Sequence, residues 1–220
     1  MRYLCIIFLT LFLFSMPANS DQLIRYVALG DSYTIGTGAT PEESWPAVVT
    51  ERLQQKGVPI ELVANLGHNG WIAQNLIDGE LPELKKLKPD FVTLLIGTND
   101  WVQGVDEKTY EEHFRRILDE LLTQVAASKI LVVTSPDFSV SPQGAGYGSG
   151  RNIAEGMDRF NQIAKKEAKA RKIKIVDVYP LSQTMKGKLS FFAEDGLHPS
   201  AKGYKLWADL IEPAFPMKVN

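Results

Sequence analysis

Apolar residues follow two patterns along most of this chain. Short runs of β-prone apolar residues predict strands over 24–29, 60–64, 91–96, 130–133 and 173–178. Between these runs, apolar residues recur every three or four positions, which predicts helices over 44–55, 71–77, 81–87, 106–127, 152–170 and 201–211. Strands that alternate with helices are typical of a parallel sheet covered by helices, so the predicted fold class is α/β.

The strand expected over 91–96 is apolar on both faces, which is typical of a central parallel strand with helices on each side. In such sheets, reactive groups collect in the loops that follow the carboxyl ends of the strands. Three polar segments fall in such places: Gly30-Asp31-Ser32, Asn65-Leu66-Gly67 and Gly97-Thr98-Asn99. We therefore expect a functional site at this edge of the sheet.

The first twenty residues have the composition of an export signal. Arg2 precedes an almost wholly apolar run from Leu4 to Phe14, and Ala18-Asn19-Ser20 supplies small residues for cleavage after Ser20. The run is short for a membrane span, and an uncleaved anchor stays open as an alternative. The single cysteine, Cys5, lies in this segment, so we expect no disulfide or thiolate site in the mature chain. A periplasmic or secreted protein with one domain over 21–220 is predicted.

Charge and composition narrow the class of protein. The formal net charge is −2 over the 220 residues, whereas nucleic-acid-binding domains are usually strongly basic. A basic run between Lys165 and Lys174 is interpreted as the solvated end of a helix. With 45% hydrophobic residues, the chain is suited to one domain with a sizeable core.

Ser32 is the candidate nucleophile. It follows the first predicted strand, so its hydroxyl is expected at the edge of the sheet. A serine nucleophile needs an imidazole base, and the second ring nitrogen needs an acceptor that fixes its tautomer. Asp195 and His198, three residues apart in a turn, can supply both. Glu194 and Asp177 are rival carboxylates, but Asp195 has the better spacing.

Four blocks of the chain, in order, resemble those of the GDSL/SGNH hydrolase family, which includes serine esterases, lipases and lysophospholipase L1-like proteins. The blocks are Gly30-Asp31-Ser32, the loop around Gly67, Gly97-Thr98-Asn99-Asp100, and Asp195-Gly196-Leu197-His198-Pro199. Tyr33 stands where the family name has leucine, and Asp31 is expected to shape the nucleophile turn. The resemblance spans about residues 26–207 and implies a three-layer α/β/α sandwich with a flavodoxin-like parallel sheet.

The resemblance also implies a role for each residue. Ser32 is the nucleophile, His198 is the base and Asp195 is the carboxylate that orients it. The oxyanion hole combines the N–H groups of Ser32 and Gly67 with the side-chain amide of Asn99. Donors fixed on the developing negative charge lower the barrier to acyl transfer. The resemblance implies no metal and no other cofactor.

Other interpretations fit the sequence less well. The common α/β-hydrolase pattern Gly-x-Ser-x-Gly requires glycine where this chain has Thr34. The glycine-rich stretch 144–150 lacks the spacing of a dinucleotide-binding loop. Asp31, Asp195 and His198 lie in no metal-binding motif. A binding module that keeps the four blocks but has no activity is the alternative from a different class.

The sequence therefore predicts an exported serine esterase that hydrolyses carboxylic esters through an acyl-enzyme on Ser32. A carbohydrate O-acetylesterase acting on polysaccharide is the alternative, and lipid-like esters and thioesters fit equally well. Tyr33, Trp71 and Trp101 are candidate pocket walls, together with the loop 144–150, which we expect to flank the site. The expected partner is a small-molecule, lipid or carbohydrate ester, with no nucleic acid and no stable membrane insertion after signal cleavage.

Overall fold

A five-stranded parallel sheet forms the centre of the protein in the computed structural model, which describes residues 22–216. The strands are β1 (Ile24–Gly30), β2 (Ile60–Asn65), β3 (Phe91–Leu95), β4 (Ile130–Val133) and β5 (Lys174–Val176). Their order is β2-β1-β3-β4-β5, and each neighbouring pair is parallel. This is the flavodoxin-like order, so the predicted α/β fold class is confirmed.

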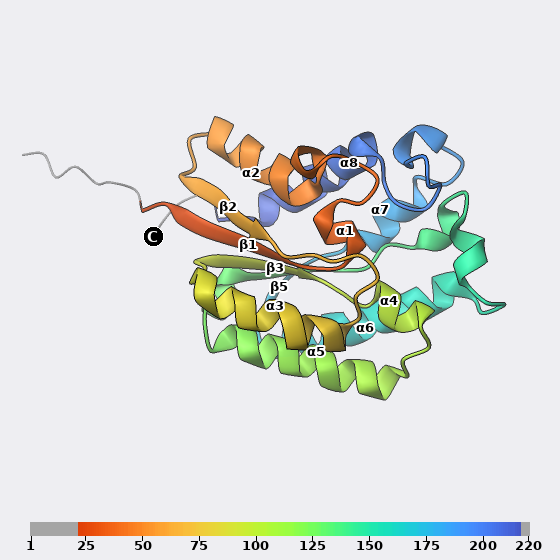
Figure 1. Ribbon diagram of the computed structural model, residues 1–220, viewed down its shortest axis with the longest axis horizontal. Helices are drawn as coiled ribbons and strands as arrows, with labels where there is room; N and C mark the ends of the chain where they lie inside the picture. The colour runs from red at the N-terminus through yellow and green to blue at the C-terminus, as the bar shows by residue number, and fades with distance from the viewer. Residues whose placement is uncertain (1–21, 217–220) are drawn as a thin grey trace, which may run out of the picture.

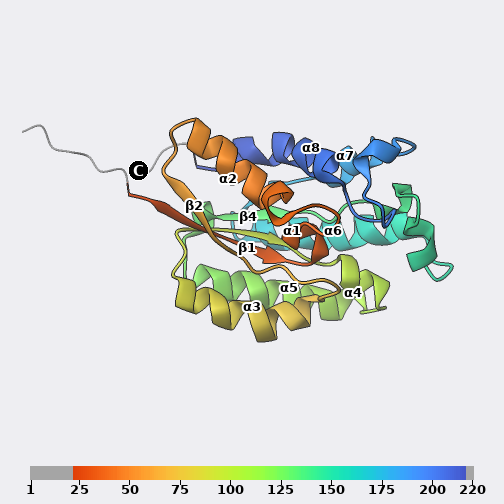
Figure 2. The same cartoon turned by 45° about the horizontal axis from the view of Figure 1, so that its top comes forward.

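Helices cover both faces of the sheet, as Figures 1 and 2 show. On one face lie α2 (Trp45–Gln55) and α8 (Ala201–Ile211), which contact each other. On the other face lie α3 (Ala73–Leu87), α5 (Glu107–Leu122) and α6 (Ile153–Ala170), with α5 between its two neighbours. The result is a three-layer α/β/α sandwich.

Shorter elements connect these layers. They are the helices α1 (Ser32–Ile35), α4 (Thr98–Val102) and α7 (Tyr179–Gln183), and 3₁₀ turns at Pro41–Glu43, Ala127–Lys129, Phe138–Val140, Gly144–Tyr147, Leu189–Phe191 and Glu212–Ala214. In Figure 1, α1 and α4 lie at the end of the sheet where the strands finish, beside the turns of the 138–150 segment. These two helices and the 138–150 segment therefore gather at the predicted edge.

The packing of the core determines where this edge lies. β3 is buried along its whole length, as expected of a strand with helices on both faces. Each long helix buries one apolar stripe, which on α5 consists of Tyr110, Phe114, Ile117, Leu118 and Leu121. Because the strands and helices are fixed by this packing, the loops after β1, β2 and β3 start from fixed points.

One continuous helix, α3, replaces the two helices that the sequence predicts over 71–77 and 81–87. Gly79 and Pro82 stand at the expected break, but the helix runs through both. Pro82 removes a single N–H from the helix. Gly79 makes room for the ring of Trp71, which a Cβ at this position would approach to 2.5 Å. The predicted break is wrong because the ring of Trp71 occupies the space that a side chain on Gly79 would fill.

Other boundaries differ at the element ends. The helix expected over 106–127 ends at Leu122, and the last strand is shorter than the predicted 173–178. The predicted export signal and Cys5 lie outside the described residues, so that prediction stays a prediction. Between residues 22 and 216, no helix combines the length and the hydropathy needed to cross a membrane.

Candidate active site

Ser32 lies where β1 turns sharply into the short helix α1. Gly30 ends the strand with φ +149°, and a Cβ there would lie 2.0 Å from the carbonyl oxygen of Leu95, so no side chain fits. Asp31 is the N-cap residue of α1, and its Oδ1 accepts the N–H of Tyr33 at 3.0 Å. This turn presents Ser32 at the carboxyl edge of the sheet.

The histidine comes from a turn near the other end of the chain. Oδ1 of Asp195 accepts the N–H groups of Leu197 and His198 at 2.8 and 3.0 Å, which shapes the turn. Gly38, in the loop after α1, lets this turn approach closely, because a Cβ on Gly38 would lie 2.6 Å from Cβ of Ala193. The ring of His198 is thereby held beside the nucleophile turn.

Ser32, His198 and Asp195 form one hydrogen-bonded chain. Nε2 of His198 lies 2.9 Å from Oγ of Ser32, and Nδ1 of His198 lies 2.7 Å from Oδ2 of Asp195. The structure thus brings together the three residues that the sequence analysis selects as nucleophile, base and orienting carboxylate. Chemically, this arrangement can move a proton from the hydroxyl to the imidazole while the carboxylate fixes the ring.

The surroundings of Asp195 favour its charged form. Partial burial opposes ionisation, but the N–H groups of Leu197 and His198 and the ring of His198 outweigh it, so the pKa of Asp195 is lowered. The rival Asp177 is engaged elsewhere, with Oδ2 at 2.7 Å from Nζ of Lys165. The geometry therefore favours Asp195 over Asp177 as the partner of the histidine.

A pocket of about 270 Å³ opens beside the serine and the histidine. Apolar side chains and polar groups both contribute to its walls, which consist of Ser32, Tyr33, Thr37, Asn69, Gly70, Thr98, Asn99, Val102, Phe138, Tyr147, Leu197 and His198. No sequence motif marks Val102, Phe138 or Leu197 as a pocket wall. A pocket of this kind suits a ligand with an apolar group and a polar group on either side of a reacting bond.

The oxyanion donors predicted from the sequence divide into two groups. Asn99 lines the pocket, and its amide donates one hydrogen bond to the carbonyl oxygen of Trp71 at 3.1 Å, which leaves its second N–H. Gly67 does not line the pocket, and its N–H donates to Oδ1 of Asn65 at 3.2 Å. The structure therefore does not support Gly67 as an oxyanion donor. It gives Gly67 a packing role, because a Cβ there would lie 2.7 Å from the backbone nitrogen of Ile35 in α1.

Gly70, in the same loop, has the position that the sequence analysis gave to Gly67. It lines the pocket with φ +76°, and a Cβ on it would meet no heavy atom within 4 Å. Its carbonyl oxygen accepts the side-chain amide of Gln103 at 2.9 Å, which ties the loop to the residue that follows α4. Gly70 is therefore the glycine whose backbone a substrate can approach.

The predicted pocket walls are only partly supported. Tyr33 lines the pocket and packs its ring against Trp207. Trp71 does not line it, since its ring stacks on His68 with centroids 4.0 Å apart. Trp101 is 4% exposed and lies under the guanidinium of Arg151. Both tryptophans are packing residues. The ring of Trp71 fills the space beside Gly79, and the ring of Trp101 fills the space beside Gly156.

The glycine-rich segment does border the site, as predicted. Tyr147 lines the pocket and is 44% exposed, so its ring borders both the pocket and solvent. Arg151 anchors the end of the segment by donating to the carbonyl oxygens of Trp101 and Val102 at 2.7 and 2.8 Å. At its start, Gln143 donates its N–H to the carbonyl oxygen of Gly196 at 2.9 Å. The segment therefore joins α4 to the histidine turn.

Three carboxyl groups are buried behind this edge of the sheet. Burial raises the pKa of Asp31 to about 8, that of Glu80 to about 9 and that of Asp100 to about 7. Hydrogen bonds from backbone N–H groups partly oppose each shift. Among residues 22–216, no group of three or more His, Cys, Asp or Glu side chains is arranged to hold a metal ion. No sequence motif marks Glu80 as part of this group.

Several known proteins are similar to this sequence. A multidomain esterase of Ruminococcus flavefaciens is 28% identical over 89% of this chain and 29% of its own length. An acetylxylan esterase of Xylanibacter ruminicola is 25% identical over 91% of this chain and 45% of its own. Thioesterase 1/protease 1/lysophospholipase L1 of Escherichia coli K12 is 26% identical over 99% of this chain and 94% of its own. This chain therefore spans less than half the length of the first two.

A solved structure and a family profile agree with these similarities. Axe2, an acetylxylan esterase from Geobacillus stearothermophilus, has the same fold, with a TM-score of 0.70 and 22% identity over 90% of this chain and 97% of that chain. The profile of the GDSL-like lipase/acylhydrolase family matches residues 28–206, which is most of the chain. The chain therefore belongs to the GDSL-like lipase/acylhydrolase family, a family of carboxylic ester hydrolases.

Proposed function

We propose that this protein is an exported serine esterase that hydrolyses carboxylic esters through an acyl-enzyme on Ser32. The proposal rests on one observation, the hydrogen-bonded chain from Ser32 through His198 to Asp195, with steps of 2.9 and 2.7 Å. Membership of an acylhydrolase family gives the same class of chemistry. An inactive binding module would have no need of this alignment.

The reaction follows from the geometry in two halves. Oγ of Ser32 attacks the ester carbonyl carbon while its proton moves to Nε2 of His198. The tetrahedral intermediate collapses, the imidazolium gives that proton to the leaving alcohol, and the acyl group stays on Ser32. Water then gives a proton to the same nitrogen as it attacks the acyl-enzyme, and collapse returns the proton to Oγ and releases the acid. Asp195 holds the ring and stabilises its charged form.

The oxyanion hole in this proposal uses Gly70 in place of Gly67. The backbone N–H of Ser32, the backbone N–H of Gly70 and the amide of Asn99 are the donors, and all three residues line the pocket. Fixed donors of this kind are each worth roughly 10²–10³ in turnover. Asn99→Ala is therefore expected to lower kcat by about 10²-fold or more, with a smaller change in KM.

The decisive experiment compares Ser32→Ala with Ser128→Ala, an exposed serine in the 3₁₀ turn before β4. Purified protein that starts at Asp21 should hydrolyse a short-chain chromogenic ester and be labelled by an organophosphonate on Ser32. Ser32→Ala should lose nearly all activity and all labelling, whereas Ser128→Ala should keep both. Equal rates for the wild type and Ser32→Ala would refute the proposal.

The substrate class has two candidates with different support. Similarity to lysophospholipase L1 over 94% of its length favours lipid-like acyl esters. Similarity to an acetylxylan esterase, and a pocket of about 270 Å³, favour a carbohydrate O-acetylesterase that accepts a small acyl group. A rate series from acetyl to longer acyl esters, run beside acetylated xylan, separates them. Rates that rise with chain length support the first candidate, and rates that peak at acetyl with release from xylan support the second.

Export is a separate part of the proposal, which the composition of residues 1–20 supports. The full chain should be processed after Ser20 and recovered outside the cytoplasm. N-terminal sequencing of the secreted or periplasmic protein checks this, with Asp21 as the expected first residue. Full-length protein in the cytoplasmic fraction would contradict it, and full-length protein in the membrane fraction would support the alternative of a retained anchor.

A further inference from the structure

Glu80 reaches from α3 to the end of β1, directly before the nucleophile. Its side chain is 1% exposed, and its Oε2 accepts the backbone N–H of Gly30 at 2.9 Å. Gly30 still pairs with Leu95 of β3, but the pairing of β1 with β2 stops at Ala28 and Asn65. On the β2 side, a side chain from the helix layer therefore accepts the N–H of Gly30. Gly30, in turn, is two residues before Ser32 and admits no side chain of its own.

Within residues 22–216, no basic side chain forms an ion pair with Glu80. Oε1 of Glu80 and Oδ2 of Asp31 are both buried without a hydrogen-bond partner in this part of the chain. Besides Glu80, the titratable groups around Asp31 lie on four elements and include no positive charge: they are Tyr33 on α1, Asp100 on α4, Tyr110 on α5 and Tyr204 on α8. Burial, with a smaller contribution from the charge on Asp31, raises the pKa of Glu80 to about 9. These surroundings favour the protonated, neutral form of Glu80.

We propose that Glu80 is a positioning residue for Ser32, which it holds in register with His198 through the hydrogen bond to the N–H of Gly30. This proposal rests on the proposed function of the Ser32 site. A neutral acid meets two requirements that an ionised or apolar side chain does not. It satisfies a buried backbone N–H, which would otherwise remain unpaired at a cost, and it places no negative charge beside the buried carboxyl group of Asp31.

The predicted consequence is a loss of alignment without a loss of binding. In Glu80→Ala the N–H of Gly30 has no acceptor, so the turn relaxes and Oγ of Ser32 moves relative to Nε2 of His198. A displacement of about 1 Å at a reacting group can cost about 10²-fold in rate. We expect kcat, and the rate of organophosphonate labelling of Ser32, to fall by about 10- to 100-fold, with KM nearly unchanged.

Glu80→Gln is the conservative variant that makes the test specific. Its amide oxygen accepts the same N–H and its side chain has the same shape, so kcat at pH 7 should stay close to that of the wild type. We expect kcat of the wild type to fall as the pH rises through about 9, because ionised Glu80 puts an uncompensated charge beside the turn. Glutamine does not titrate, so Glu80→Gln should lack this fall. Replacing a residue with only a structural role would change neither the pH dependence of kcat nor kcat relative to KM.

Glu167→Ala is the matched control, because Glu167 is 5% exposed on α6 and has its contacts with arginines away from the site. It should lower the melting temperature and leave kcat unchanged below that temperature. The proposal is overturned if Glu80→Ala keeps the kcat of the wild type, or if Glu80→Gln loses as much as Glu80→Ala. If Glu80→Ala does not fold, the proposal is overturned when kcat of Glu80→Gln falls at alkaline pH as much as kcat of the wild type. An active Ser32→Ala would instead refute the proposed function.

Discussion

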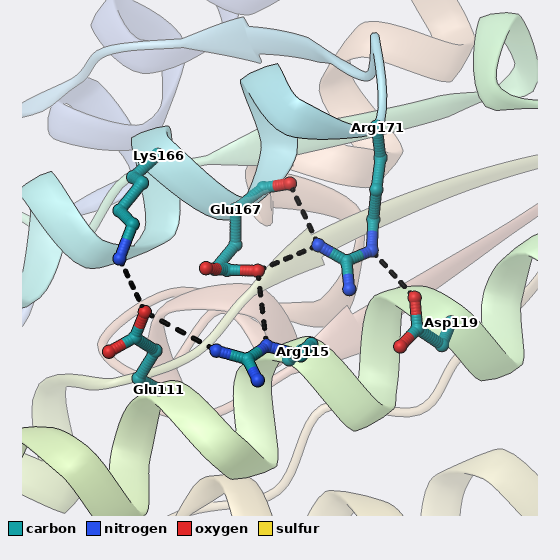
Figure 3. A network of polar contacts seen from close by, with 6 residues as sticks. All are labelled: Glu111, Arg115, Asp119, Lys166, Glu167 and Arg171. Atoms are coloured by element: carbon teal, nitrogen blue, oxygen red, sulfur yellow. Dashed lines mark hydrogen bonds and ion pairs between the residues drawn. The ribbon is translucent and has the colours of Figure 1, made fainter.

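Two buried glutamates on the same helix layer have opposite surroundings. Glu167 on α6 is 5% exposed, and its Oε2 lies 2.7 Å from Nη1 of Arg171 and 3.5 Å from Nε of Arg115 (Figure 3). Glu80 on α3 is 1% exposed and has a backbone N–H as its partner. A buried carboxyl needs either a counter-ion or its proton, and the two sites use one solution each.

The difference indicates which region is built for stability and which for chemistry. The network of Figure 3 extends to Glu111, Lys166 and Asp119, with contacts of 2.7 Å from Lys166 to Glu111 and from Arg171 to Asp119, so it joins α5 to α6. Each carboxylate of this network contacts a lysine or an arginine. Behind Ser32, by contrast, Asp31, Glu80 and Asp100 form no ion pair within residues 22–216. Groups with displaced pKa values concentrate at functional sites. Breaking each region in turn should therefore give different losses.

The largest expected effect is the loss of activity in Asp195→Asn. An asparagine can hold the ring of His198 in the wrong tautomer, with the proton on Nε2, so that the nitrogen facing Ser32 no longer accepts a proton. We expect kcat to fall by about 10³–10⁴-fold, with little change in melting temperature. Steady-state kinetics and circular dichroism check both halves of this prediction.

Asp119→Asn is the matching change in the network. Asp119 has its contact with Arg171 at 2.7 Å, and its side chain is 59% exposed. Its removal should lower the free energy of unfolding by about 1 kcal/mol or less, because an exposed ion pair contributes no more than that. Since this ion pair lies away from Ser32, kcat should stay within about two-fold of the wild type. If Asp195→Asn kept a tenth or more of the activity, Asp195 would not be the orienting carboxylate.

The second effect is a fall in stability as the pH rises. The pKa of Glu80 is about 9 in the folded state against an ordinary 4.5, and that of Asp31 is about 8 against 3.8. The folded protein therefore binds these protons where the unfolded chain has released them, and stability falls as the pH rises through this window. Each such group contributes up to about 1.4 kcal/mol per pH unit.

Urea unfolding at pH 5, 6, 7 and 8 measures this slope. Asp195 and Glu111 have lowered pKa values, so their own contributions change below this range and do not mask it. Glu80→Gln should show a shallower slope than the wild type, since one of the titrating groups is gone. A free energy of unfolding that stays constant or rises between pH 5 and pH 8 would contradict the neutral state of these acids.

A smaller effect is expected when Glu167 is replaced by alanine. Arg171 keeps Asp119 as a partner but loses a hydrogen bond to a buried charged group, and Arg115 loses a neighbour. Hydrogen bonds to charged groups contribute about 1.5–3 kcal/mol, so the free energy of unfolding should fall by about that amount. Urea unfolding measures it, and kcat of the folded fraction should not change. A parallel loss of kcat would show that the two regions are coupled.

The sequence was sufficient for those site residues whose partners are close along the chain. Asp195 and His198 are three residues apart, so one turn holds both, and the Gly-Asp-Ser block contains its own N-cap at Asp31. The sheet could be predicted for a similar reason, because buried parallel strands are short apolar runs with polar ends. In each case the signal is local, whereas the long-range contact between Ser32 and His198 was expected from the resemblance to the family.

Residues whose roles depend on distant packing were not predictable in this way. Gly67 and Gly70 lie in one loop, and only the contact of Gly67 with α1 decides which of them faces the pocket. Trp71 and Trp101 stand next to predicted blocks, yet their rings fill space above glycines of neighbouring helices. Glu80 fell between two predicted helices, so its position on a buried helix face could not be read from periodicity.

The smallest expected effect is that of salt, which should act on the network and not on the site. At 1 M NaCl the Debye length is about 3 Å, so exposed charges of the network are screened. The expected loss is below about 1 kcal/mol in the free energy of unfolding, and the loss should be smaller in Glu167→Ala, which lacks the centre of the network. The bonds among Ser32, His198 and Asp195 are direct contacts, so kcat on a neutral ester should stay constant. A kcat that declined with salt in step with stability would mean that the charges between α5 and α6 help to hold the nucleophile, and the separation of the two regions would then be wrong.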